Sequence, residues 1–231
     1  GAGNCEKAAS LFSAFHVQRY VAVDISASYL RDSLESLQRK HPAMDMLGIG
    51  LDFAQTLNLP AEVGDGPRTL FYPGSSIGNF TPAEALAFLR QVHAACAGGA
   101  LLIGVDLVKP VAILEHAYDD PLGVTAAFNR NLLRHLTALV GTDFDIADWR
   151  HVAFFNAAES RIEMHLEALA ETVVRWPEGE RRFAPGERMH TENSYKWRPD
   201  DFAGLLESAG FSRLQHWTDK HHWFAVFAAF S

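Results

Sequence analysis

The run GSSIGN at residues 74–79 sets two serines and an asparagine between and beside two glycines. Its first five residues match G-x-S-x-G, the turn that exposes the nucleophilic serine of many hydrolases. Such a turn needs a helix that starts almost at once after the serine, here Ser76, and a downstream acid and histidine. The nearest helix-start signal lies at residues 81–82, and nothing marks out a downstream acid and histidine. The pattern is therefore a poor match for a serine hydrolase.

The same loop suits a different chemistry, because it follows a predicted strand of an α/β sheet. Ligands of such sheets bind beyond the carboxyl ends of the strands. Gly74 and Gly78 would let the backbone approach a ligand closely, while Ser75 and Asn79 would offer polar groups. A plain turn built around Asn79 explains the same residues. The loop by itself leaves both interpretations open.

Three further features are expected at the same edge of the sheet. Gly1 and Gly3 open a helix, as in loops that pass close to a cofactor. Asp24 ends a strand, where a carboxylate can accept hydrogen bonds from a ribose. Asp52 and Phe53 end the next strand and pair an acceptor for an exocyclic amine with a flat apolar face. Each feature has a plainer explanation as a helix cap or a core aromatic, but their order favours a cofactor that carries adenosine.

The glycine pattern is incomplete, because the third glycine of G-x-G-x-x-G is missing and Lys7 stands nearest to its place. That full pattern belongs to sites for a pyrophosphate. The departure of this sequence from the pattern disfavours NAD as the cofactor and favours a nucleoside cofactor without a pyrophosphate, namely S-adenosylmethionine. Lys7 would then meet the cofactor's carboxylate, although an exposed helix lysine is the simpler interpretation.

Helical and strand patterns alternate through the first half of the chain and position these residues. Continuous apolar strands indicate a parallel sheet that is covered on both faces. The sequence at 81–84 predicts a capping box with proline at the first helical position, and Ser26 is the expected cap of another helix. The expected helices are 5–15, 26–40, 82–96 and 199–209, and the expected strands are 19–25, 46–53, 69–73, 100–108, 212–218 and 223–230.

The pattern changes in the middle of the chain. Residues 111–140 look helical, with a break at 119–123. Residues 151–196 alternate like hairpin strands, with a turn expected at 156–160. This stretch differs in character from the alternating helices and strands on either side of it.

We therefore predict an α/β protein with a doubly wound, Rossmann-like sheet. The cofactor domain is expected to comprise residues 1–108 and 197–231, and residues 109–196 an inserted α+β substrate subdomain. Because Gly1 opens what reads as a strand-to-helix loop, we also expect a strand and further residues upstream of it.

Composition excludes several classes of partner. The 231 residues are 48% hydrophobic and carry a formal net charge of −8, which argues against nucleic acids and anionic membranes as partners. Two cysteines without motif spacing suggest the reducing cytosol, and no apolar run is long enough to span a bilayer. The 11 histidines lack the spacing of metal ligands, so we assign no metal. We expect a cytoplasmic monomer.

Four stretches together are more specific than any Rossmann pattern: GSSIGNFTPAEA, DLVKPVAILEHAYDDPLGVTAAFNRNLL, AESRIEMHL and HTENSYKWRP. In this order they closely resemble the histidine-specific, S-adenosylmethionine-dependent methyltransferases of ergothioneine biosynthesis. The resemblance spans essentially the whole chain. It implies the class I methyltransferase fold and three successive methylations of the α-amine of L-histidine, which give hercynine.

The resemblance also implies roles for individual residues. Cofactor contacts are expected at Gly1, Lys7, Asp24, Asp52 and Phe53, to which we add Gly3 and Gly74 as close backbone approaches. Asn79 and Tyr118 would hold the α-amino and carboxylate end of the substrate and orient the amine for attack. The imidazole would be held by Glu192 and Ser194, with Asn193 beside them and Met164 lining the pocket.

The chemistry of these residues agrees with the implied roles. The reacting amine must be neutral, and an asparagine and a tyrosine can orient it without adding charge. Glu192 and Ser194 lie two apart, so in an extended segment both would face the imidazole.

The family also has an N-terminal helical segment that completes the substrate pocket, and we expect this chain to lack it. Two alternatives remain: a relative that acts on another amino acid or amine, and a non-catalytic fragment that only binds the cofactor.

Overall fold

The computed structural model describes all of residues 1–231. Its helices are α1 (Glu6–Ala9), α2 (Ala27–Lys40), α3 (Pro82–Cys96), α4 (Val111–Tyr118), α5 (Val124–Val140) and α6 (Pro199–Ser208), with short 3₁₀ helices η1 (Ala61–Val63), η2 (Ser76–Asn79) and η3 (Ile146–Asp148). Its strands are β1 (Arg19–Asp24), β2 (Asp45–Gly50), β3 (Thr69–Tyr72), β4 (Ala100–Asp106), β5 (Trp149–Asn156), β6 (Arg161–Ala168), β7 (Thr172–Trp176), β8 (Gly179–Phe183), β9 (Arg188–Tyr195), β10 (Arg213–Thr218) and β11 (Phe224–Phe230). None of the helices is both long and apolar enough to cross a membrane.

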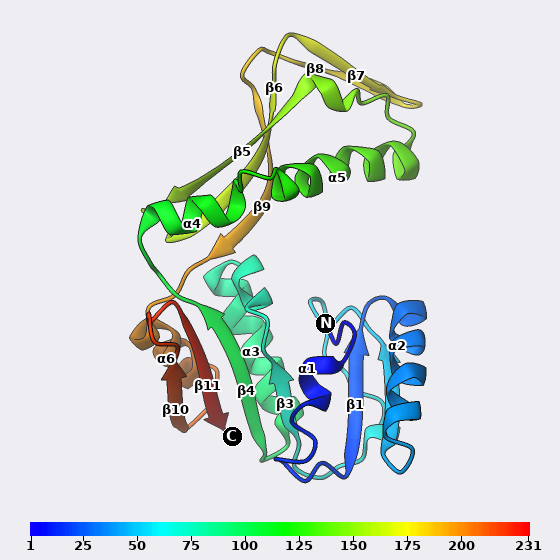
Figure 1. Cartoon of the computed structure of the whole chain (residues 1–231), viewed down its shortest axis with the longest axis vertical. Helices are drawn as coiled ribbons and strands as arrows, with labels where there is room; N and C mark the ends of the chain where they lie inside the picture. The colour runs from blue at the N-terminus through cyan, green and yellow to red at the C-terminus, as the bar shows by residue number, and fades with distance from the viewer.

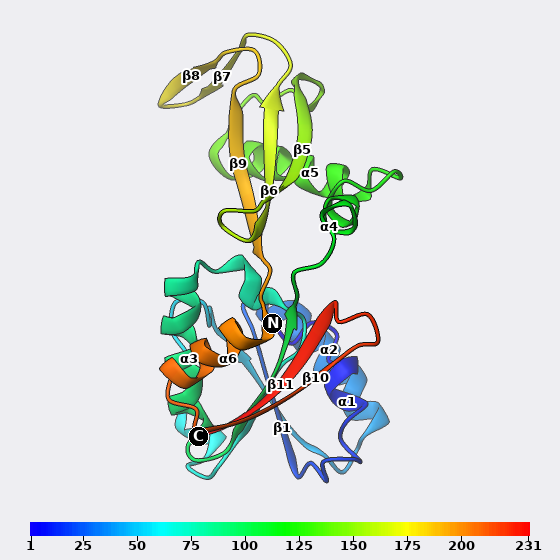
Figure 2. The same cartoon turned by 90° about the vertical axis from the view of Figure 1, so that its left-hand side faces the viewer.

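Two sheets form the lower part of the molecule in Figures 1 and 2, where the predicted fold has one sheet. β1 and β2 pair in parallel, and four further strands follow the order β10-β11-β4-β3. β3 and β4 are parallel, whereas β11 runs antiparallel to both of its neighbours. A short turn joins β10 to β11, and strands joined in this way must be antiparallel. The predicted parallel pairing is confirmed for β1–β2 and for β3–β4, and the antiparallel β11 makes the larger, Rossmann-like sheet a mixed one.

The main hydrophobic core lies between the larger sheet and helices α3 and α6. Leu89 of α3, Ile103 of β4, Phe202 of α6 and Phe227 of β11 are completely buried in it. Burying side chains of this size removes much apolar surface from water and holds the four elements together. The carboxyl ends of β3 and β4 are thereby held firmly beside each other.

Local sequence signals decide some helix ends and fail at others. Thr81 and Glu84 form the predicted capping box at the start of α3. Ser26 does precede α2, but its side chain makes no cap hydrogen bond, and its N–H donates to Asp24 Oδ1 at 3.0 Å instead. The predicted helix 5–15 is also wrong, because α1 stops at Ala9. Later backbone bonds in this stretch span three residues in part, as the segment curls to bury Phe12.

The upper part of the molecule is a second layered unit (Figures 1 and 2). β5, β6 and β9 form an antiparallel sheet, and α4 and α5 pack against β5 and β6. The predicted helix break and the predicted turn both occur, since α4 ends at Tyr118 and β5 ends at Asn156. β7 and β8 pair as a separate hairpin.

Two chain segments connect the parts and run side by side. Leu107 bridges to Trp197, and the N–H of Trp197 donates to the carbonyl of Asp106 at 3.1 Å. The Val108 N–H returns a bond to the Trp197 carbonyl at 3.0 Å. The end of β4 and the end of β9 are therefore fixed to each other. The predicted boundaries near residues 108 and 197 remain a prediction.

Candidate active site

Four of the predicted cofactor residues meet at the carboxyl end of β1. The Gly1 nitrogen donates to the Val23 carbonyl at 3.1 Å, and the Gly3 N–H donates to Asp24 Oδ2 at 3.3 Å. A Cβ on Gly1 would lie 3.7 Å from Cζ of Phe53, so the glycine backbone lies beside that ring. An acidic acceptor, a bare backbone and an aromatic face thus stand together, which fits the polar ribose and flat base of an adenosine.

Three other predicted cofactor residues are less clearly assembled. Asp52 lies beyond the end of β2, not within it, and its carboxylate already accepts from the Gln55 amide at 2.7 Å and the Ala54 N–H at 3.2 Å. The Lys7 side chain is exposed on α1. Gly74 is exposed after the end of β3. None of these three makes a hydrogen bond or an ion pair with Asp24.

The loop of residues 74–79 is held by the end of β4. Ser75 has a left-handed backbone with φ of 58°, and its Oγ accepts the N–H of Asp106 at 2.8 Å. Ser76 begins η2, a helical turn that was not predicted. In a nucleophile elbow the serine itself occupies the strained position, whereas here the preceding residue does. The geometry is therefore that of a bound loop whose last residue, Asn79, is exposed at the site.

Gly78 allows this loop to touch the upper part of the molecule. A Cβ at this position would lie 2.9 Å from the Tyr195 carbonyl oxygen and 3.4 Å from its nitrogen. Only a residue without a side chain fits between η2 and β9 at this distance. The close approach carries Asn79 to the edge of β9.

The predicted imidazole residues share one face of the upper sheet. In the β6–β9 register Glu192 is opposite Met164 and Ser194 is opposite Ile162. Side chains alternate along a strand, so Asn193, opposite Glu163, points to the other face. The structure thus brings Glu192, Ser194 and Met164 to one face, whereas Asn193 meets Glu192 only at the cavity along β9.

Tyr118 reaches this face from the last residue of α4. Its hydroxyl lies 2.7 Å from Ser194 Oγ, within hydrogen-bond distance. Its backbone carbonyl is 2.8 Å from Nε2 of the buried His151, whose Nδ1 lies 2.9 Å from the Asn129 amide. Because the Asn129 amide donates to Nδ1, Nε2 carries the proton and donates to Tyr118. This chain of bonds fixes the end of α4.

A cavity of about 350 Å³ opens between the two parts of the molecule. It is lined only by polar residues: Asn79 from η2 and His190, Thr191, Glu192 and Asn193 from β9. Burial raises the pKa of the Glu192 carboxyl above its ordinary value, and the nearby Lys196 ammonium offsets part of that rise. The cavity suits a small polar molecule with hydrogen-bond donors.

Lys196 and Asp106, for which no role was predicted, belong to the candidate site. The Lys196 side chain is 1% exposed, and its Nζ lies 2.9 Å from Asp106 Oδ2, 2.8 Å from Ser194 Oγ and 2.9 Å from the Tyr118 hydroxyl. The period of a strand was the available signal, since residues 192, 194 and 196 share one phase.

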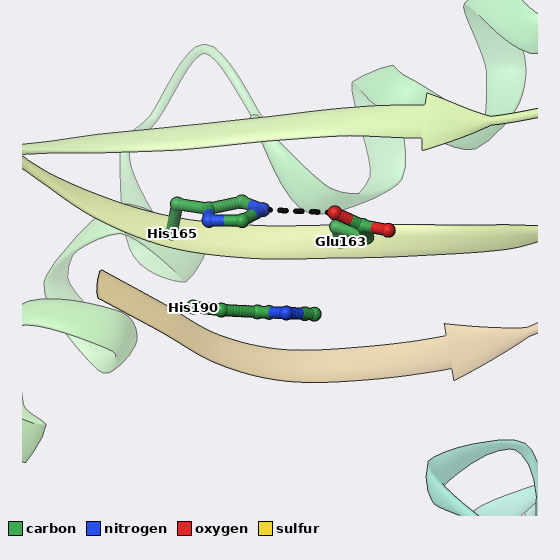
Figure 3. A group of neighbouring side chains, drawn as sticks. All are labelled: Glu163, His165 and His190. Carbon is green, nitrogen blue, oxygen red and sulfur yellow. Dashed lines mark hydrogen bonds and ion pairs between the residues drawn. The ribbon is translucent and has the colours of Figure 1, made fainter. Parts of the chain in front are cut away.

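A group of possible metal ligands combines His190 of the cavity lining with two residues of β6. Glu163, His165 and His190 come within 4.8 Å of one another (Figure 3). The two imidazole rings are stacked with centroids 4.5 Å apart and planes at 21°, so their nitrogen lone pairs run side by side and do not converge. The Glu163 carboxylate also accepts bonds from Asn156, Arg161 and His165. This arrangement is that of a hydrogen-bonded ion-pair cluster, and we assign it no metal.

Comparisons with known proteins agree with the geometry. The family described as "Histidine-specific methyltransferase, SAM-dependent" matches residues 1–230. A histidine N-alpha-methyltransferase of Mycobacterium tuberculosis is 39% identical over 228 residues, which cover 95% of this chain and 70% of the relative. The enzyme of the same name from Mycolicibacterium smegmatis is 38% identical over 226 residues, with the same coverage. The apo structure of the S-adenosylmethionine-dependent methyltransferase SibL matches the whole chain and 48% of its own length, with a TM-score of 0.52 and 15% identity, and supports the class I fold.

Proposed function

Because the chain belongs to the histidine-specific, S-adenosylmethionine-dependent methyltransferases, we propose that it methylates the α-amine of free L-histidine three times and so forms hercynine, an intermediate of ergothioneine biosynthesis. The proposal rests on one observation above the others. The Tyr118 hydroxyl and Ser194 Oγ, 2.7 Å apart, join the expected amino-acid end of the pocket to the expected imidazole end. Tyr118, Asn79, Glu192 and Ser194 would therefore act on one small molecule.

At the cofactor end, Asp24 would accept the ribose hydroxyls and the Phe53 ring would lie against the adenine, with the backbone at Gly1 and Gly3 passing close by. When bound, S-adenosylmethionine supplies a methyl group on a positively charged sulfur. The protein's own contribution is positioning, which accounts for much of the rate of a two-reactant displacement. We propose that residues 109–196 form the substrate subdomain, that the protein acts as a monomer and that it resides in the cytoplasm.

At the substrate end, Asn79 and Tyr118 would orient the amine and carboxylate with neutral groups. An ammonium cannot attack, so the reacting amine must first lose its proton. Glu192 and Ser194 would take the two imidazole nitrogens. A site built to pair a polar ring discriminates strongly against side chains that leave its groups unpaired. Glu192 and Ser194 would therefore make the site select histidine over an apolar amino acid.

The test is to incubate the protein with S-adenosylmethionine and histidine and to follow product masses, with tryptophan and histamine as parallel substrates. We expect histidine alone to gain one, two and then three methyl groups. Glu192→Ala should abolish most of this gain, whereas Glu159→Ala, in the exposed β5–β6 turn, should leave it unchanged. Equal methylation of tryptophan would contradict the assignment of histidine as the substrate. Methylation of histamine would contradict a role for the substrate's carboxylate in binding.

A further inference from the structure

The buried Lys196 ammonium has no free donor. It has three N–H groups and no lone pair. Its three partners are Asp106 Oδ2 at 2.9 Å, Ser194 Oγ at 2.8 Å and the Tyr118 hydroxyl at 2.9 Å. Each of the two hydroxyl oxygens must therefore accept one hydrogen bond from Lys196.

The two hydroxyls also bond to each other, at 2.7 Å, and this bond uses one of their two protons. One O–H proton is left for the pocket. If Ser194 donates into the pocket, Tyr118 must donate to Ser194 and offers the pocket a lone pair. If Tyr118 donates into the pocket, Ser194 must donate to Tyr118. The Lys196 ammonium thus couples the two hydroxyls: whichever one donates its proton into the pocket, the other must donate to it.

This inference rests on the proposed function. We propose that Lys196 is a positioning residue that couples recognition of a neutral imidazole at Ser194 to acceptance of the substrate's amine N–H at Tyr118. A neutral imidazole offers its N–H to Glu192 and its lone pair to the Ser194 proton. In the first two methylations Tyr118 then accepts an amine N–H, and the amine lone pair stays free to attack.

The charged form of the ring reverses this arrangement. An imidazolium has two N–H donors and no lone pair, so Ser194 must accept from it and pass its own proton to Tyr118. The Tyr118 proton is then left to bond to the amine lone pair, which must be free for the reaction. Histidine with a protonated ring should therefore bind but react slowly.

Charged and titratable groups reach Lys196 from each neighbouring element. Asp106 ends β4, Lys109 follows it, Tyr118 ends α4, and Glu192 lies on β9. Lys109 pairs with Asp106 Oδ1 at 2.5 Å. It has no hydrogen bond to either hydroxyl, so Lys109→Met is a matched control. Each lysine-to-methionine change leaves Asp106 one lysine partner, but only Lys196→Met frees the hydroxyl pair.

The experiment compares the kcat values for histidine and for 1,2,4-triazol-3-yl-alanine between about pH 7.5 and 5.5. The triazole keeps an N–H and a lone pair throughout this range, whereas the imidazole of histidine, with an ordinary pKa near 6.5, becomes mostly charged. Changes in the protonation of Glu192 and of the substrate's α-amine affect both substrates, so they largely cancel in the ratio of the two kcat values. For the unmodified protein and for Lys109→Met, we expect the histidine-to-triazole kcat ratio to fall about tenfold.

In Lys196→Met the same ratio should change less than about twofold, because the two hydroxyls can turn independently. A tenfold fall that persists in Lys196→Met would overturn the coupling. If that variant does not fold, the unmodified protein still decides: a fall confined to KM, with kcat constant, would overturn it as well. If histidine gains no methyl group at any pH, the proposed function is wrong and the coupling falls with it.

Discussion

The Tyr118 hydroxyl lies 2.7 Å from Ser194 Oγ, although the two residues are 76 positions apart in the chain. Leu114, Ile162 and Met164 pack in one buried cluster and hold α4 against β6. Tyr118 is the last residue of α4, so this apolar contact determines the position of its phenol group. The packing of the upper unit thus brings two proposed substrate-binding groups within hydrogen-bond distance of each other.

Ser194→Ala should mainly weaken substrate binding. The change removes the proposed hydrogen bond to the imidazole, which contributes about 1–3 kcal/mol to substrate binding, and also leaves Lys196 and Tyr118 each without one buried partner. We expect the KM for histidine to rise about ten- to a hundredfold, with a smaller effect on kcat. Ser208→Ala removes a hydroxyl bonded within α6, to the Gly204 carbonyl, and serves as the control. Unchanged KM in Ser194→Ala would remove Ser194 from the pocket.

Gly78→Ala should both destabilise the protein and impair methyl transfer. The new Cβ would lie 2.9 Å from the Tyr195 carbonyl oxygen, so η2 must move away from β9. Overpacking of this kind costs about 1–3 kcal/mol. Gly204→Ala is the matched control, since its Cβ meets no atom within 4 Å in helix α6, where alanine should stabilise by about 0.5–1 kcal/mol. Urea unfolding of the two variants gives both values, and equal stabilities would refute the close contact.

Asp24→Asn should weaken cofactor binding without unfolding the protein. Burial raises the pKa of Asp24, but hydrogen bonds from the Ser26 and Gly3 N–H groups outweigh it, so the net pKa is below the ordinary value. The group is therefore a carboxylate at neutral pH. An amide keeps the shape but halves the acceptor capacity, and we expect the Kd for S-adenosylmethionine to rise about tenfold or more. Calorimetry on Asp24→Asn and on the exposed Asp201→Asn separates this effect from a general loss of charge.

Glu163→Gln should lower stability in a pH-dependent way. Burial alone would raise the pKa of Glu163, but hydrogen bonds from Asn156, Arg161 and His165 prevail and lower it from 4.5 to about 2. A carboxyl whose pKa is depressed by folding stabilises the protein above its unfolded value, and this contribution is lost as the pH falls through the folded value. The difference in stability between the native protein and the variant should therefore be largest above about pH 5. It should shrink as the pH falls from 4.5 towards 2.

At neutral pH we expect the Glu163→Gln change to cost about 1–3 kcal/mol, the range for hydrogen bonds to a charged group. Denaturant unfolding over the pH series measures it. Glu159→Gln in the neighbouring exposed turn is the control and should show no such dependence. A difference that stays constant down to pH 2 would place the stabilisation elsewhere.

Much of this protein could be predicted from the sequence, because the signals concerned are local. The capping box at Thr81, the helix break before α5 and the turn after Asn156 each follow from residues within one or two turns of chain. The order of Gly1, Asp24 and Phe53 along successive strand ends likewise predicted a common edge, since parallel connections bring such ends together. The helix predicted at 5–15 was too long, because burial of Phe12 outweighed the helical periodicity beyond Ala9.

Tertiary structure alone decided the centre of the site. The β6–β9 register set Glu192 and Ser194 on one face and Asn193 on the other, and a shift by one residue would have exchanged them. The folding of α4 onto the sheet brought Tyr118 to Ser194, and the paired connections brought Asp106 to Lys196. Local sequence carries no record of such pairings, because they depend on how apolar faces pack across the whole chain. The residue types were therefore readable in advance, but the hydrogen-bond network that joins them was not.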